Sequence, residues 1–438
     1  MSDQQRNVLY IAYYFPPLGL SGVQRTLKFV KYLPSYGWKP TVLTVGPTGY
    51  YAFDESLLRE IEEAQVDVIR TGSLDINRMM KGKRPVRMPS EGLRKILQFF
   101  GDLFLIPDSK IGWKRKAVKA ASELLRTKHF DAIVATAPPQ TDFLIGYILK
   151  KRFKVPLVLD YRDAWLEYPF KYFPTPLHRI LHRRMERRVV HGCDRVVVTH
   201  RRVKENLVKR YSFLTYHDVM IISQGFDAAD LGDVPPRPNR AGKMTIVHTG
   251  TFYAGRSPSV LLHALHNILK ASPKMRGRID LRLVGTTRRE DQTLVRKLGL
   301  QNDVSFLGYL EHHACVKHLQ EADVLWFVLD NDYQSPGKLY EYFGVRKPIL
   351  GSVVDGYMKQ LLLESKAGIC VNIESVAEHE AALTDLVERF DAGTLPRPSG
   401  EFVSRFDRKT LTGELAKTLE TLMDIDHNAF VKVEEGGS

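Results

Sequence analysis

Short apolar runs alternate with longer amphipathic stretches along the chain. In the first half the runs are VLYIAYYF, PTVLTV, DVIRTG, AIVATA, PLVLDY, RVVVTH and VMIISQG. These runs have the length and the β-branched content of strands, and the stretches between them have the length and amphipathic pattern of helices. Alternating strands and helices predict an α/β fold, in which a parallel sheet is covered by helices on both faces.

The same alternation starts again after a proline-rich break, DVPPRPNR, at residues 233–240. The later runs are TIVHTG, LRLVG, VSFLG, VLWFVL, KPILG and GICVN. We therefore predict two Rossmann-like, doubly wound parallel-sheet domains at residues 1–234 and 241–405, joined by a linker at 235–240 and facing across a cleft. The helical stretch at 406–438 could return to the first domain.

Composition and charge narrow the class of protein. The chain has 438 residues, a formal net charge of +14 and a sequence pI near 9.5, so it has room for two or three domains and an anionic partner is expected. It has no apolar run of membrane-spanning length and no signal pattern at its start, which favours a cytoplasmic protein. Cys193, Cys315 and Cys370 are too scattered for a disulfide framework or a thiolate metal site.

A glycine turn follows the first apolar run, in the stretch YYFPPLGLSGVQRTL. Gly19 and Gly22 bracket this turn, and Ser21 lies between them at the start of a helix. Backbone N–H groups at such a helix start can bind an anion, usually a phosphate. The spacing is not the G-x-G-x-x-G of dinucleotide sites, and a plain strand-to-helix turn is the alternative.

The stretch VLDYRDAW places three charged residues, Asp160, Arg162 and Asp163, just past the end of an apolar run. Ligands of doubly wound sheets bind at the carboxyl ends of the strands. Asp163 could act as a base or bind a sugar hydroxyl, with Arg162 as its counter-ion. A salt bridge that only closes the loop is the alternative.

The second half repeats the plan of strand, glycine turn and helix in VHTGTFYAGRSPSVLLHAL. Gly250 allows a close approach of the backbone, and Arg256 near the helix start could grip a diphosphate with its two-pronged guanidinium. A solvated arginine is the alternative.

The stretch SPGKLYEYFGVRKPILG begins a helix at Pro336 and Gly337. Lys338 and Glu341 are three residues apart and therefore share one face of it. The lysine could neutralise a phosphate, and the carboxylate could accept hydrogen bonds from a ribose diol. A surface ion pair is the alternative, but the apolar neighbours, among them Leu339, favour a partly buried helix.

Several of these motifs together resemble, in family order, the family 4 glycosyltransferases: GLSG, DYRD, SQGFD, GTFYAGRSP, RLVG, DVSFLGYL and SPGKLYEYFGVRKPILG. The resemblance covers nearly the whole chain. It implies a GT-B fold and the transfer of a sugar, of hexosyl type, from a nucleotide donor with retention at the anomeric carbon. The family often has two glutamates eight residues apart, but Tyr333 stands eight before Glu341 here, and Lys338 could take over part of that role.

The resemblance and the motifs together give the expected site. The catalytic candidates are Asp163, Lys338 and Arg256. The donor-binding candidates are Gly19, Gly22, Gly250, Arg256, Gly337, Lys338, Leu339 and Glu341. The acceptor-binding candidates are Ser21, Arg162 and Asp163.

No cofactor or metal is expected beyond the nucleotide sugar, because helix N-termini, Arg256 and Lys338 would stabilise the departing diphosphate. Asp330 and Asp332 only mimic a D-x-D metal motif. Acceptors of related enzymes are saccharides or lipid-linked sugars in surface polysaccharide or glycolipid synthesis. Alternatives are a scaffold of the same fold without turnover and a sugar-nucleotide epimerase.

Two basic segments favour attachment to the anionic inner face of a membrane. Residues 80–116 combine lysines and arginines with an apolar helical stripe, and residues 177–195 place Arg179, Arg183 and Arg187 opposite Leu177 and other apolar residues. A core helix with a solvated loop is the alternative for the first segment. Nucleic acid is not expected as a partner, because the chain shows no recognition module.

Overall fold

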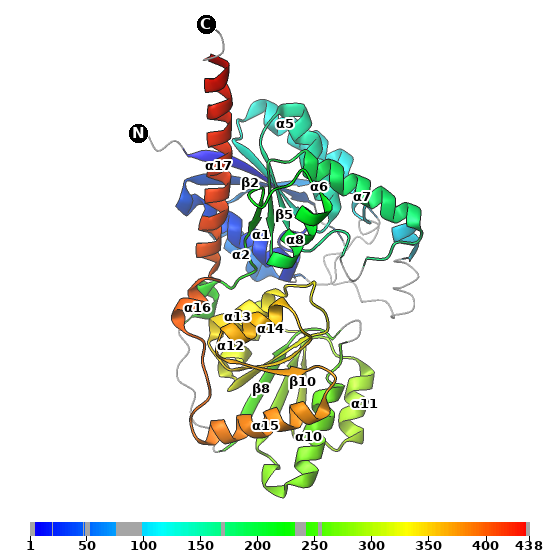
Figure 1. The fold of residues 1–438 in the computed structure, drawn as a ribbon, viewed down its shortest axis with the longest axis vertical. Helices are drawn as coiled ribbons and strands as arrows, with labels where there is room; N and C mark the ends of the chain where they lie inside the picture. Colours follow the sequence, from blue (N-terminus) through cyan, green and yellow to red (C-terminus); the bar gives the residue numbers. More distant parts are fainter. Residues whose placement is uncertain are drawn as a thin grey trace. The chain divides into compact units, whose positions relative to one another are not determined.

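The structure is a computed structural model that describes residues 5–19, 21–46, 48, 53–75, 99–167, 171–232, 242–252 and 256–434. The chain divides into two compact units (Figure 1). Unit 1 contains Met1–Ser223 and Arg408–Ser438, and unit 2 contains Gln224–Asp407. The division falls at Ser223, ahead of the proline-rich segment at 235–240, which lies outside the described residues.

Unit 1 is built on a seven-stranded parallel sheet with the order β3-β2-β1-β4-β5-β6-β7. Its strands are β1 (Arg6–Ile11), β2 (Trp38–Val45), β3 (Asp67–Thr71), β4 (Ala132–Ala137), β5 (Leu157–Tyr161), β6 (Arg195–Val198) and β7 (Val219–Ile221). The central strands are buried on both faces, as near-continuous apolar runs require. Each apolar run of the first half contributes a strand.

Two layers of helices cover this sheet. One core lies under α5 (Lys114–Thr127), α6 (Gln140–Phe153), α7 (Pro176–His191) and α8 (Arg201–Arg210). The other lies under α1 (Ser21–Tyr32), α2 (Glu55–Glu63) and α17 (Arg408–Glu434). Short 3₁₀ turns span Leu33–Tyr36 and Ile111–Trp113, and residues 99–104 are helical.

The C-terminal helix α17 belongs to unit 1. Leu411, Leu415 and Leu419 repeat every four residues, so they form one stripe that is buried in the same core as α1. The Tyr36 hydroxyl donates a hydrogen bond of 2.8 Å to the Lys409 carbonyl near the start of the helix. The last part of the chain is thus tied to the first sheet.

Unit 2 is built on a six-stranded parallel sheet with the order β10-β9-β8-β11-β12-β13. Its strands are β8 (Met244–Thr249), β9 (Ile279–Val284), β10 (Val304–Gly308), β11 (Val324–Leu329), β12 (Ile349–Val353) and β13 (Gly368–Asn372). Its helices are α9 (Ala228–Leu231), α10 (Ser259–Ala271), α11 (Arg289–Lys297), α12 (His312–Glu321), α13 (Gly337–Val345), α14 (Tyr357–Glu364), α15 (Val376–Asp391) and α16 (Gly400–Ser404), with a 3₁₀ turn at Pro273–Met275. Two parallel-sheet Rossmann-like units confirm the predicted fold class.

Helix α7 exposes Arg179, Arg183 and Arg187 and buries Val189 as the sequence suggested, but its buried face also includes two polar residues. Leu177, expected on the apolar side, is 59% exposed, whereas His182 and Glu186 are buried. His182 is held by the Trp165 indole N–H, which donates to its Nδ1 at 3.0 Å. The polar partners inside the unit therefore decide the orientation of the helix. No described helix combines the length and apolarity that crossing a membrane requires.

Candidate functional site

At the carboxyl ends of the unit 1 strands, Asp160 is buried and paired with Arg25 of α1. The Arg25 guanidinium donates to Asp160 Oδ1 from Nη2 at 2.9 Å, and it also donates to the carbonyls of Ile222 and Ser223 at 3.0 and 2.7 Å. Thr136 donates to the second carboxylate oxygen of Asp160 at 2.9 Å. The Arg25–Asp160 pair therefore ties the ends of β4, β5 and β7 to α1, and Asp160 has little capacity left for a ligand.

Arg162, also at this edge, forms no direct ion pair with Asp163 within the described residues. It is buried, and its guanidinium donates to the carbonyls of Gly22 and Pro138. A Cβ at Gly22 would lie 2.9 Å from Arg162 Nη1, so the glycine makes room for the guanidinium. The arginine clamps the start of α1 to the loop after β4, which corrects the expected pairing.

The remaining candidates of the first domain lie around this clamp. Gly19 is buried in the turn after β1, Ser21 is the first residue of α1, and nothing in the described residues tests the roles expected for them. Asp163 is half-buried beside Arg162. Burial raises the pKa of Asp163, and the positive charge of Arg162 only partly opposes this rise. Asp163 is thus a carboxyl group that holds a proton more readily than an exposed one.

At the carboxyl edge of the unit 2 sheet, Gly250 follows β8 and lies beneath two basic side chains. A Cβ at Gly250 would be 2.8 Å from His248 Nε2 and 3.3 Å from Lys338 Nζ. The backbone N–H of Gly250 donates to the Val284 carbonyl at 2.7 Å, which fixes the strand end. The glycine therefore lets the lysine of α13 reach over the end of β8.

His248 has a defined tautomer. Its Nδ1 lies 2.9 Å from the Trp326 carbonyl, so Nδ1 must donate and Nε2 is left as an acceptor on the side of Gly250. The ring stacks on Phe252 with centroids 4.6 Å apart. Burial, together with the charges of Lys338 and Arg256, lowers the pKa of His248 to about 3, so the imidazole is neutral.

Helix α13 is fixed to the sheet by its apolar side. Leu339, Tyr340, Tyr342 and Phe343 are buried, and the Thr249 N–H donates to the Tyr342 hydroxyl at 2.9 Å. The helix starts at Gly337 with Pro336 as N-cap, and no side chain caps its first turn. Its first N–H groups and partial positive charge suit an anion.

Lys338 and Glu341 lie on α13 as expected, and both are half-buried. Within the described part of the chain they form no ion pair with each other, so the alternative of a surface ion pair is wrong. Burial lowers the pKa of Lys338, and the Glu341 charge partly opposes this. A bound anion would offset the cost of holding this ammonium in a half-buried position.

Arg256 is buried, and two side chains that follow β11 hold it. Its Nε donates to Asp330 Oδ1 at 2.8 Å, and its Nη2 donates to Gln334. Asn331 also donates to Asp330 Oδ1, at 2.9 Å. The alternative of a solvated arginine is wrong. Asp330 orients a cation here, which is a different use from the metal motif that its spacing mimics.

Four residues that position the site were missed by sequence reasoning: Arg25, His248, Asp330 and Gln334. Arg25 lies in the helix after the glycine turn, and only the fold shows that it faces Asp160. His248 lies inside the strand-like run TIVHTG, where a single histidine does not indicate a functional role. In sequence Asp330 resembles a metal ligand, but its place after a buried strand also marks it as a candidate partner for Arg256.

The chain matches two family models. Residues 22–219 match the glycosyl transferase 4-like domain, and residues 235–390 match the glycosyl transferases group 1. No curated protein sequence matches the chain significantly.

Several solved structures share the fold over almost the whole chain. HepE from Anabaena, solved with UDP and glucose, has a TM-score of 0.63 at 16% identity, with 95% of this chain and 100% of that chain covered. Sucrose-phosphate synthase from Thermosynechococcus elongatus has a TM-score of 0.64 at 14% identity, with 96% and 100% covered. The lipopolysaccharide outer core galactosyltransferase WaaB has a TM-score of 0.59 at 12% identity, with 95% and 99% covered. The chain, with its two Rossmann-like units and its two family matches, belongs to the family 4-type glycosyltransferases of GT-B fold.

Proposed function

We propose that this protein transfers a hexosyl group, with retention, from a nucleotide-diphosphate sugar to a saccharide or lipid-linked acceptor in surface polysaccharide or glycolipid synthesis. The observation that carries this proposal is the arrangement at the carboxyl edge of the unit 2 sheet. There the ammonium group of Lys338 lies over Gly250, at the N-terminus of α13. Arg256 is held near the end of the adjacent β11 by Asp330.

These groups suit the donor. A diphosphate would meet the first N–H groups of α13 together with the Lys338 ammonium, while Glu341, one turn further on, would accept hydrogen bonds from the ribose hydroxyls. The bound UDP and glucose of the Anabaena relative support a nucleotide-sugar ligand of this kind.

The same groups suit the reaction. When the bond between sugar and phosphate breaks, negative charge grows on the leaving diphosphate. Preorganised cations and N–H dipoles lower the barrier when they stabilise that charge more than they stabilise the ground state. We therefore propose that Lys338, the α13 N-terminus and Arg256 carry this step without a metal ion or cofactor.

We assign the acceptor to unit 1 and the donor to unit 2. Asp163 lies at the carboxyl edge of the unit 1 sheet, and its raised pKa favours a hydrogen-bonding or proton-handling role toward an acceptor hydroxyl. Arg162 acts there as a clamp that keeps the loop in place. All three cysteines are free, in agreement with a reducing compartment such as the cytoplasm.

Nucleotide binding is tested first, by the thermal shift of the full-length protein with UDP, GDP, ADP, CMP and their sugars, with and without a chelator. We expect one nucleoside diphosphate to raise the melting temperature equally in both conditions. Titration calorimetry then compares the wild type with Lys338→Ala, Glu341→Ala and Arg256→Ala, and Lys270→Ala on the exposed side of α10 serves as control. Loss of binding in the control as well would contradict the assignment.

Turnover separates an enzyme from a scaffold. With the donor identified, release of nucleoside diphosphate is measured with and without candidate acceptors, and the anomeric configuration of the product is read by NMR. We expect release that depends on the acceptor and a retained configuration, and we expect Asp163→Ala to lower turnover more than donor affinity. Binding without any release would favour the scaffold, and release without an acceptor would favour an epimerase.

A further inference from the structure

Most of the excess positive charge of the chain is concentrated on three helices of unit 1. Helices α5, α6 and α7 carry five, three and five lysines and arginines, against the acids Glu123, Asp142 and Glu186. Asp142 and Glu186 are completely buried, so Glu123 is the one acid that these helices present to solvent. The formal net charge of the whole chain is +14, so this layer contributes a large share of it.

The three helices form one continuous layer. Helix α6 packs against α5 on one side and against α7 on the other, and all three cover the same face of the unit 1 sheet (Figure 1). Their exposed cations therefore lie on one side of the unit. We call this exposed side of α5, α6 and α7 the basic face.

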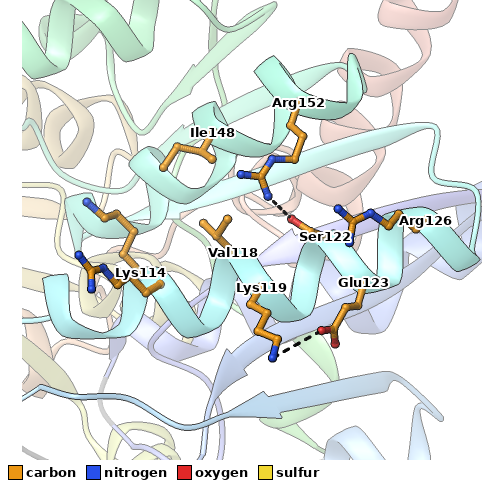
Figure 2. A pocket seen from close by; sticks show the side chains of 9 residues that line it. Lys114, Val118, Lys119, Ser122, Glu123, Arg126, Ile148 and Arg152 are labelled. Carbon is orange, nitrogen blue, oxygen red and sulfur yellow. Dashed lines mark hydrogen bonds and ion pairs between the residues drawn. The ribbon is translucent and has the colours of Figure 1, made fainter.

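A groove between α5 and α6 lies on the basic face (Figure 2). It has a volume of about 450 Å³, and its lining residues include Lys114, Arg115, Lys119, Arg126 and Arg152. Figure 2 shows Lys114 and Arg126 at opposite ends, with Val118 and Ile148 between them. These two ends are twelve residues apart on one helix, or about 18 Å along its axis, so one phosphate cannot contact both.

Within the described part of the chain, two cations of the groove make only single polar contacts with other side chains of the protein. The Lys119 ammonium lies 4.0 Å from Glu123, and both side chains are largely exposed. Arg152 donates to the Ser122 hydroxyl at 3.0 Å. The exposed Lys119–Glu123 pair contributes little to stability, so Lys119 can be redirected toward an external anion at small cost.

Apolar side chains are exposed beside these cations. On α7, Leu177 and Ile180 are 59% and 47% exposed, next to Arg179 and Arg183. The helical residues 99–104 add Phe104, which is 73% exposed. The carbonyl of Leu103 lies 3.1 Å from His178 Nε2, which places this segment against the start of α7.

We propose that the basic face is a docking surface for an anionic lipid bilayer, with several headgroups on the α5–α6 groove and the exposed apolar side chains at the start of α7 in the interfacial zone. A bilayer is a plane of many phosphates above an apolar layer. It therefore matches both an array of cations longer than one phosphate and the neighbouring leucine, isoleucine and phenylalanine. This inference does not depend on the proposed function, because it concerns unit 1 helices outside the nucleotide site.

Nucleic acid fits less well. The groove is lined by aliphatic Val118 and Ile148, which offer no stacking surface for bases. A duplex would use the phosphate contacts but would leave Leu177 and Ile180 in water. Binding to duplex DNA is therefore an outcome of the test rather than a second proposal.

The test is flotation of the full-length protein with vesicles of phosphatidylcholine, alone and mixed with phosphatidylglycerol, over a range of salt. We expect flotation only with the anionic vesicles, weakening as salt increases. The triple variant Lys119→Glu, Arg126→Glu, Arg152→Glu should bind on the order of 100-fold more weakly, since each cation near an anionic surface contributes about fivefold.

Two matched controls distinguish binding by the basic face from effects of net charge and of exposed apolar side chains in general. Lys270→Glu, Lys274→Glu, Arg276→Glu removes the same charge from exposed positions of unit 2 and should leave flotation unchanged. Leu177→Ser, Ile180→Ser should weaken binding that persists at high salt, whereas Leu363→Ser, at a residue 55% exposed in unit 2, should not. Unchanged circular dichroism spectra and melting temperatures in every variant show that the chain is folded.

Three outcomes would overturn the proposal. One is the absence of flotation with anionic vesicles. Another is an equal loss in the unit 2 charge variant, which would make the effect one of net charge. The third is competition by duplex DNA or free inorganic diphosphate that removes the protein from vesicles at concentrations comparable to the lipid phosphate, because the groove would then serve a soluble anion.

Discussion

The two units repeat one local plan, in which a strand, a glycine turn and a helix bring basic side chains to the carboxyl edge of a sheet. In unit 1 the basic side chains are used up internally, because Arg25 pairs with Asp160 and Arg162 donates to backbone carbonyls. In unit 2, Lys338 lies over Gly250 with its pKa lowered by burial, and among the described residues it has no ion pair. The same motif therefore serves as a brace in one unit and leaves a cation available for a ligand in the other.

The difference follows from what lies opposite each basic side chain. Asp160 is on the strand next to β4 and meets Arg25 directly, at 2.9 Å. Lys338 is on a helix whose inner face is filled by Tyr342 and other apolar groups, so its ammonium extends along the sheet edge instead. Arg256 of unit 2 is also buried and paired, with Asp330, so pairing alone does not separate the two units. The half-buried Lys338, which has no ion pair among the described residues, is what marks the ligand site.

The largest expected effect is the loss of stability when the Arg25–Asp160 pair of unit 1 is broken. Asp160→Ala leaves the Arg25 guanidinium buried without its carboxylate and should cost about 3–5 kcal/mol of stability. The double variant Arg25→Met, Asp160→Leu replaces both charges by apolar groups and should cost less than either single change. Urea unfolding followed by circular dichroism measures both. A cost below about 1 kcal/mol for Asp160→Ala would mean that the pair behaves as an exposed one.

The next largest effect is the pH dependence of stability that comes from Glu186, a buried acid of unit 1. Glu186 of α7 accepts from the Tyr211 hydroxyl at 2.7 Å and from Arg210 at 2.9 Å, yet burial raises its pKa to about 7. The folded state then binds a proton more tightly than the unfolded state, whose value is 4.5. The Glu186 contribution to stability therefore falls as the pH rises from about 4.5 to 7, by up to about 3 kcal/mol.

Comparison with Glu186→Gln isolates this contribution from other titrating groups. Buried His248 has the opposite sign, because its lowered pKa makes stability rise with pH between about 3 and its ordinary value of 6.5. The difference in unfolding free energy between the two proteins removes the His248 term. We expect that difference to shift in favour of the glutamine variant as the pH rises, and a flat difference would show that Arg210 keeps Glu186 ionised throughout.

Loss of Lys338 in unit 2 should affect ligand affinity rather than stability, the reverse of what we expect for the Arg25–Asp160 pair of unit 1. Lys338→Ala removes a half-buried ammonium that has no ion pair among the described residues, so stability should be unchanged or slightly higher. Affinity for the nucleoside diphosphate should fall on the order of 10-fold to 100-fold, as for the loss of a hydrogen bond between charged groups. Calorimetry and thermal melting of the same preparation measure both quantities. A clear loss of stability would make Lys338 a structural residue like Arg25.

The fold, and much of the candidate donor site at the carboxyl edge of the unit 2 sheet, could be predicted from the sequence. Strand-length apolar runs predict both sheets, and the helix start at Gly337 with Lys338 and Glu341 on one face is where the motif places it. The use of each charge could not be predicted, since Arg25 and Asp160 are 135 residues apart and meet only through the strand order. The burial of His182 and Glu186 on α7 could not be predicted for the same reason, because their partners Trp165 and Tyr211 meet them only in the fold.

The smallest and most discriminating change adds one methyl group to each glycine turn. Gly22 is the second residue of α1, and Gly22→Ala would displace the buried, hydrogen-bonded Arg162 nitrogen that lies 2.9 Å from the added methyl group. Stability should fall by about 1 kcal/mol, as for a small overpacking of a buried group, while donor affinity should stay nearly unchanged. Gly250→Ala meets the stacked, hydrogen-bonded ring of His248 at 2.8 Å and Lys338 at 3.3 Å, so donor affinity should fall while unit 1 is unaffected. If Gly22→Ala instead weakened nucleotide binding as much as Gly250→Ala, the first glycine turn would also serve the donor, and the contrast between brace and ligand site would not hold.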